Sequence, residues 1–138
     1  MYELKRAKKI EELIKLGDKE LKVSLSFESI ARDFIVRYNT VVKAENEVEA
    51  YKNNTEDIDK LSEAMNAYEV AILNLLQLIF GVENTKEILN YYEENYIEMV
   101  YEVMPFLTEV IVPKLKQYME EERKNLSKKY KGKISGSK

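Results

Sequence analysis

The 138-residue sequence has no cysteine, no histidine and no tryptophan, and it holds only four glycines and two prolines. The lack of cysteine excludes disulfides and thiolate sites, and the lack of histidine removes the usual general base and a common metal ligand. Three clusters of carboxylates occur in the sequence: Glu45/Glu47/Glu49, Glu93/Glu94 and Glu120/Glu121/Glu122. None has the Glu-x-x-His spacing of helical di-metal sites, and the glycines form no phosphate-binding loop. We therefore predict a protein that is not an enzyme, with no catalytic residue, no metal site and no cofactor.

Charge is unevenly distributed along the chain. Seven basic and no acidic residues lie between Arg123 and Lys138, whereas the rest of the chain holds 15 basic and 25 acidic residues. The net charge of −3 gives no general argument for nucleic acid or a membrane as partner. The longest apolar stretch, Val70 to Phe80, is too short to span a bilayer, and no signal-peptide core follows the basic N-terminus. We expect a cytoplasmic protein.

The first quarter of the chain changes its apolar period. Residues 1–11 are rich in charge and compatible with a short helix, and apolar and polar residues then alternate as far as Phe27. Period two is typical of half-buried strands, and Gly17 with Asp18 provides the residues of a tight turn. We predict a β-hairpin over residues 12–27, whose loop extends to Lys19 in an alternative register.

The spacing becomes helical from Glu28 onward, and a first helix is expected to end near Asn53-Asn54. A second follows, because Asn54 with Asp57 three residues later resembles a capping box. The part of this helix from Val70 to Phe80 is apolar nearly all round, which is typical of a central helix. Gly81 is placed to end it.

Two further helical stretches complete the predicted fold. Asn84 with Glu87 suggests a second capping box and a short helix over residues 85–94. In the last stretch Pro105 suits the first turn of a new helix, whereas Pro113 would kink a continuous one. Residues 131–138 lack periodicity and are predicted to form a flexible basic tail. The predicted fold is α+β, mostly α: an N-terminal β-hairpin followed by a bundle of about four helices, in a single domain over residues 1–130.

Ten tyrosines are conspicuous in a chain without tryptophan. Several of them gather near the junction of the last two predicted helices, beside methionines and a phenylalanine. Aromatic and Met side chains are enriched where proteins bind one another, while core packing is the competing interpretation. The residues predicted to bind a protein partner are Tyr91, Tyr92, Tyr96 and Phe106.

The hairpin segment from Ile14 to Val23, continued through Leu25 to Ile30 into an all-helical remainder, resembles the tail assembly chaperones of long-tailed bacteriophages and prophages of Gram-positive bacteria. The hairpin-to-helix start covers about a fifth of the chain, and size, element order and a lysine-rich C-terminus extend the similarity loosely over the rest. The resemblance implies a non-enzymatic protein of the bacterial host cytoplasm that binds the tape-measure protein and keeps it soluble during tail-tube assembly. Its partner would be the tape-measure or a tail-tube protein.

A second interpretation is a small dimeric helical adaptor or antitoxin-like regulator. It is based on the apolar stripe of the second predicted helix, which alternates three- and four-residue steps as coiled-coil seams do. Homo-oligomerisation is compatible with both interpretations. The stripe consists of Ile58, Leu61, Met65, Tyr68, Ile72, Leu75 and Ile79.

Overall fold

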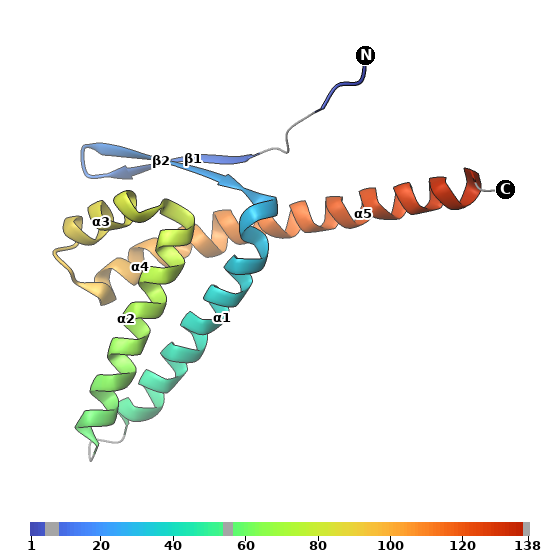
Figure 1. Ribbon diagram of the computed structural model, residues 1–138. Helices are drawn as coiled ribbons and strands as arrows, with labels where there is room; N and C mark the ends of the chain where they lie inside the picture. The colour runs from blue at the N-terminus through green and yellow to red at the C-terminus, as the bar shows by residue number, and fades with distance from the viewer. Residues whose placement is uncertain (5–8, 54–56, 137–138) are drawn as a thin grey trace. The chain divides into compact units, whose positions relative to one another are not determined.

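The computed structural model describes residues 1–4, 9–53 and 57–136, with side chains described as far as Lys128 (Figure 1). It has the predicted class, α+β and mostly α, with a two-stranded hairpin preceding the helices. The chain divides into two compact units, Met1–Tyr101 and Glu102–Lys138, where the sequence predicted one domain over residues 1–130. The second unit is helical as far as Gly136.

The hairpin is formed by strands β1 (Lys9–Leu16) and β2 (Lys19–Ser26), which pair antiparallel. Leu16 pairs with Lys19, so Gly17 and Asp18 form a two-residue turn, and Gly17 has a φ of +64°. This confirms the predicted hairpin and starts it three residues earlier than expected. The short helix suggested for residues 1–11 is wrong for 9–11, which pair with Ser24–Ser26, while residues 1–4 have no regular structure and 5–8 lie outside the described residues.

The two faces of the hairpin differ as period two predicts. Ile10 pairs with Leu25, and both are buried together with Leu21 and Val23 of β2. The opposite face is exposed and carries Leu13 among its charged and polar residues. Strand β2 contacts helices α1 and α2, so the apolar face of an otherwise marginal two-stranded sheet is covered by helices.

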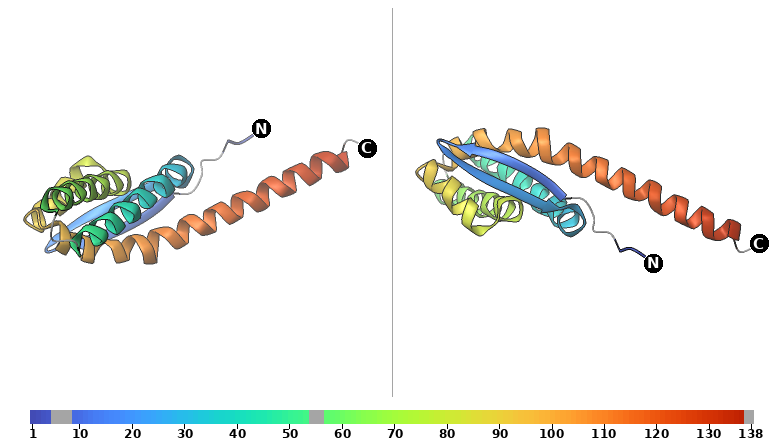
Figure 2. Two further views of the ribbon diagram at one scale, coloured as in Figure 1. Left: turned by 90° about the horizontal axis from the view of Figure 1, so that it is seen from below. Right: turned by 90° about the horizontal axis from the view of Figure 1, so that it is seen from above.

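Helices α1 (Phe27–Lys52) and α2 (Ile58–Phe80) lie side by side, and the hairpin lies across the end where α1 begins and α2 ends (Figures 1 and 2). Asp57 caps α2, because its carboxylate accepts the backbone N–H of Lys60 at 3.1 Å. The capping residue is therefore the second member of the predicted box, and Asn54 lies outside the described residues. The buried apolar residues of the two helices are Phe27, Ile30, Phe34, Val41, Ala44, Val48, Ala64, Ala71, Ile72, Leu75, Leu76, Ile79 and Phe80.

Gly81 ends α2 as predicted, with a φ of +83° and its N–H donated to the carbonyl of Gln77 at 3.0 Å. Helix α3 (Val82–Tyr91) begins directly after it, three residues earlier than expected. The capping box predicted at Asn84 is wrong, because this residue lies inside the helix and its amide donates to the carbonyl of Lys22 at 3.4 Å. The positive φ at Gly81 redirects the chain at once, so no separate capping segment is needed.

Helix α3 runs antiparallel to β2, with one contact for each turn of the helix. The Asn84 amide reaches Lys22, the Glu87 carboxylate forms a salt bridge with Lys19, and the Tyr91 ring lies against Gly17. Positions 84, 87 and 91 follow the three- and four-residue spacing of one helical face. The hairpin is thereby held along the length of α3, and its turn reaches the end of that helix.

The last helical run consists of α4 (Tyr96–Phe106), the π-turn η1 (Leu107–Ile111) and α5 (Val112–Gly136). The prediction that Pro105 starts a new helix is wrong, since it lies inside α4. Pro113 follows the π-turn, in which the Val112 N–H bonds to the carbonyl of Leu107. The wider turn accommodates the proline, which has no N–H of its own.

The backbone of residues 131–136 is helical, where the sequence predicted no regular structure; residues 137 and 138 lie outside the described residues. Lysines near a helix C-terminus interact favourably with the helix dipole, which favours this continuation. Every side chain from Met119 to Lys128 is exposed. This part of α5 is therefore a helix without a covered face.

Candidate protein-binding surface

The corner between α3 and α4 is a tight turn with an unusual backbone. Glu93 and Glu94 have φ angles of +53° and +61°, and their N–H groups bond to the carbonyls of Asn90 and Leu89 at 3.0 Å each. The left-handed region costs a residue other than glycine roughly 1–2 kcal/mol. Such strain persists where the surrounding contacts determine the conformation, and it is concentrated at functional positions.

A capping interaction starts α4 directly after this turn. The side-chain oxygen of Asn95 accepts the N–H of Glu98 at 3.2 Å, and its amide donates to the Glu98 carboxylate at 3.4 Å. Asn95 and Glu98 have the same spacing as Asn84 and Glu87. The capping pair of this region therefore lies eleven residues after the predicted one.

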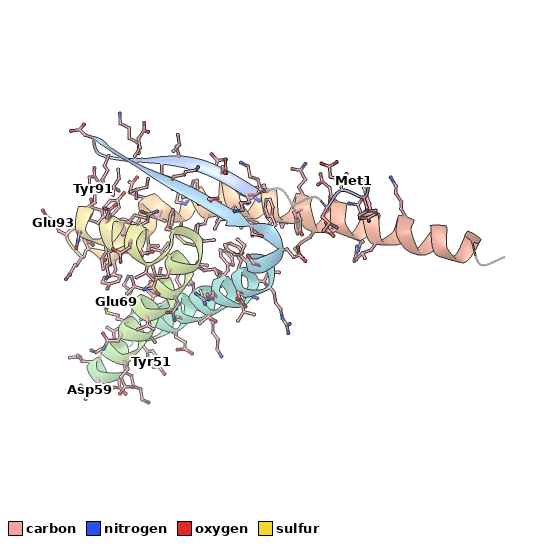
Figure 3. All side chains as sticks on the ribbon, turned by 45° about the horizontal axis from the view of Figure 1, so that its top comes forward. Met1, Tyr51, Asp59, Glu69, Tyr91 and Glu93 are labelled. Carbon is pink, nitrogen blue, oxygen red and sulfur yellow. The ribbon has the colours of Figure 1, made fainter. Side chains whose placement is uncertain are left out.

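Two of the four predicted partner-binding residues lie in contact at this corner. Tyr91 is the last residue of α3 and is 53% exposed, although one side of its ring lies against Gly17. Tyr92 is half-buried, and its ring meets that of Tyr91 edge-on at a centroid distance of 5.1 Å. Figure 3 shows Tyr91 and Glu93 at this corner, with Tyr51 and Asp59 at the opposite end of the α1–α2 pair.

The other two predicted residues lie at the two ends of α4. Tyr96 is its first residue and half-buried; burial, followed by the carboxylates of Glu69 and Glu94, raises the pKa of its hydroxyl. Phe106 is its last residue, ten positions further and about 15 Å along the helix axis. The structure thus places Tyr91, Tyr92 and Tyr96 around one corner and Phe106 apart from them. Their binding of a partner stays a prediction.

Ile97 and Tyr101 are more exposed than any of the four predicted residues, at 62% and 77%. They are four residues apart and therefore lie on one face of α4. Met99 of the same helix is, by contrast, fully buried. The signal that was missed is the acidic pair beside them, Glu98 and Glu102, also spaced by four, with Glu94 in the turn just before the helix.

We call these five residues the α4 surface: Ile97, Tyr101, Glu94, Glu98 and Glu102. They lie in a stretch from Glu87 to Pro113 that holds six acidic residues and neither lysine nor arginine. Nearby, burial raises the pKa of the Tyr68 hydroxyl, with further contributions from Glu45, Glu49 and Tyr101. The surface therefore combines exposed apolar side chains with negative charge, a composition suited to a partner that is apolar and basic.

The apolar stripe of α2, the basis of the regulator interpretation, is divided between core and surface. Ile72, Leu75 and Ile79 are buried, whereas Ile58 and Met65 are exposed. The half of the stripe nearest Gly81 is thus already used within the first unit. A dimer formed along the whole stripe would require that unit to open.

A cavity of about 240 Å³ lies between α1 and α2 and is lined by Arg37, Thr40, Ala71 and Asn74. Arg37 donates to the backbone carbonyl of Asn74 at 2.7 Å, and the Thr40 hydroxyl donates to that of Val36 at 2.9 Å. The Arg37 bond joins α1 to α2, whereas the Thr40 bond lies within α1, and both give the polar lining of the cavity a structural explanation. Within the described ranges, no group of three or more acidic side chains is arranged to hold a metal ion.

Comparison with protein families, curated proteins and solved structures finds no match for this chain. In the part of the chain that the structure describes, no helix combines the length and apolar composition needed to cross a bilayer.

Proposed function

We propose that the protein is a non-enzymatic chaperone that binds an apolar helical segment of another protein, its client. The observation that carries the proposal is the exposure of Ile97 and Tyr101 on one face of α4. Large apolar side chains exposed together are typical of protein-binding surfaces. Tyrosine is suited to such a surface, because it covers much area and loses little conformational entropy on binding.

The proposed client is the tape-measure protein of a bacteriophage tail, in the cytoplasm of the bacterial host. A tape-measure protein presents long apolar helical faces that must be shielded until tail-tube subunits assemble around it. An exposed helix face with an apolar row packs side by side on such a segment, as in other helix-binding proteins. The sequence resemblance to tail assembly chaperones and the hairpin-first order of elements both support this client.

Co-expression with the tape-measure protein tests the proposal. Replacing Ile97 and Tyr101 with serine should reduce the soluble fraction of the client, because the apolar row is removed. The control replaces Leu13 and Val36 with serine, which deletes two apolar side chains that are exposed elsewhere in the first unit. Far-UV circular dichroism establishes that both variants fold. A client that stays as soluble with the Ile97/Tyr101 variant as with the wild type would contradict the proposal.

Tyr92 and Tyr96 require a separate measurement, because both are half-buried. Alanine at either position should weaken capture of the client while the helical signal is retained. Loss of the fold in both variants would instead assign these tyrosines to the core. Neighbouring genes for tail-tube and tape-measure proteins would favour the chaperone, whereas a neighbouring toxin gene would favour the regulator.

A further inference from the structure

The exposed half of α5 has the composition of a helix that binds an acidic surface. Met119 and Leu126 are two turns apart, so they lie on the same face, and both are exposed. Glu120, Glu121 and Glu122 follow Met119, and from Arg123 onward every charged residue is basic; Arg123, Lys124 and Lys128 are exposed. We call the segment from Met119 to Gly136 the α5 arm. It is a cationic helix with apolar side chains on one face.

From Met119 to Lys128, the part whose side chains are described, the arm lacks the packing that usually stabilises a helix. None of its side chains from Met119 to Lys128 is covered. Isolated helices of this length are marginal in water, because their nucleation is costly and packing provides most of the stability of helices in proteins. A partner that covers Met119 and Leu126 would therefore stabilise the arm.

The α4 surface is complementary to the arm in chemistry. It offers Ile97 and Tyr101 as exposed apolar contacts, with Glu98 and Glu102 in the adjacent row. The two segments are opposite in charge, and each presents its apolar residues along one helical face. We propose that the α5 arm of one copy binds the α4 surface of a second copy.

This self-association uses residues of the chain alone and does not depend on the proposed client. It is partly electrostatic, so it weakens as salt shortens the screening length from about 10 Å at 0.1 M. Reciprocal docking of two arms buries both surfaces in a closed pair. If the client uses the same surface, it displaces the second copy.

Two charge-reversed variants of the full chain test the proposal. The arm variant carries Lys124→Glu and Lys128→Glu, and the surface variant carries Glu94→Lys and Glu102→Lys. The surface pair leaves the cap formed by Asn95 and Glu98 unchanged. In each variant alone, the arm and the α4 surface carry charges of the same sign and repel each other. The dissociation constant for self-association should therefore rise at least about tenfold. An equal mixture should restore association, because each arm then meets a surface of opposite charge.

Light scattering over a range of protein concentrations provides the measurement. The matched controls are Lys15→Glu with Lys43→Glu and Glu47→Lys with Glu63→Lys, which change exposed residues elsewhere by the same charge. Both controls should associate as the wild type does. Far-UV circular dichroism reports folding, and neutral Gln variants at the same positions replace any reversal that unfolds the chain.

Three results would overturn the proposal. The first is a wild type that is monomeric at every concentration in low salt. The second is a mixture that fails to associate while each variant alone is monomeric, since this would show that the arm and the α4 surface do not pair between two copies. The third is an equal loss of association in the control variants, which would reflect net charge rather than these residues.

Discussion

Helices α2 and α5 are nearly equal in length, with 23 and 25 residues, and opposite in their surroundings. The second half of α2 is buried among α1 and the hairpin-bearing end of the first unit, whereas α5 from Met119 to Lys128 has no covered side chain. The second half of α2 is stabilised by packing; α5 has the buried Leu115 near its start, but from Met119 to Lys128 it depends on local propensity and charge. The length of a helix in this protein therefore does not indicate that it is buried. The residues available to a partner lie in the exposed part of α5.

The largest expected effect on stability comes from truncating one leucine in α2, compared with one in α5. Leu75→Ala, at a side chain only 1% exposed, should lower the free energy of unfolding by roughly 2–5 kcal/mol, because it leaves a cavity. Leu126→Ala in α5 should change it by less than about 0.5 kcal/mol in dilute protein. Urea unfolding followed by circular dichroism measures both. A large loss from Leu126→Ala would show that α5 is packed in solution.

The same glycine-to-alanine change should have opposite effects in the two regions. Gly81→Ala should cost about 1–3 kcal/mol through backbone strain alone, because φ there is +83° and no other atom lies near the added methyl group. Gly132 lies within helical backbone, so Gly132→Ala should stabilise the helix by up to about 1 kcal/mol and increase its helical content. Thermal melting and the far-UV signal distinguish the two. A neutral Gly81→Ala would contradict the strain at this junction.

The smallest expected effect is on the pH dependence of stability, and it concerns Tyr68 in the first unit. Burial and the neighbouring carboxylates raise the pKa of Tyr68 above that of an unfolded tyrosine, about 10. The resulting stability is complete below that pH and is lost as the pH rises through the folded-state pKa. Tyr68→Phe should therefore flatten the alkaline fall in stability. Tyr2→Phe, at an exposed ring outside any helix or strand, is the control, and equal behaviour of the two variants would exclude a role of Tyr68.

The hairpin and the end of α2 could be predicted because each depends on local rules. Alternation of side chains defines a strand, and Gly17 and Gly81 occur where the backbone needs a positive φ. The start of β1 at Lys9 was missed because charged residues there carry no strand signal and pair with Ser24–Ser26 through tertiary structure. Capping pairs were harder, since the Asn-x-x-Glu spacing recurs along the chain: the pair at 84 lies inside a helix, whereas the pair at 95 precedes one.

The candidate surface could be located from the sequence only in part. The gathering of tyrosines identified the corner, and Tyr91 and Tyr92 do lie in contact there. The exposed face of α4 was missed because apolar residues occur all round that helix, with Ile97 outside and Met99 inside. The period of apolar residues identifies the buried face of a helix only when the opposite face is polar. The acidic row beside Ile97 and Tyr101 would have resolved the ambiguity.

The π-turn over Leu107–Ile111 sets the rotational phase of everything that follows it. It holds one residue more than an α-helical turn, so the side chains of α5 are rotated by about 100° from the directions they would have in an uninterrupted helix. Deleting one residue within this turn would return the run to a regular α-helix and carry Met119, Leu126 and the basic side chains round the axis together. A single-residue change of length at this point would thus redirect the whole α5 arm while its own sequence stayed the same.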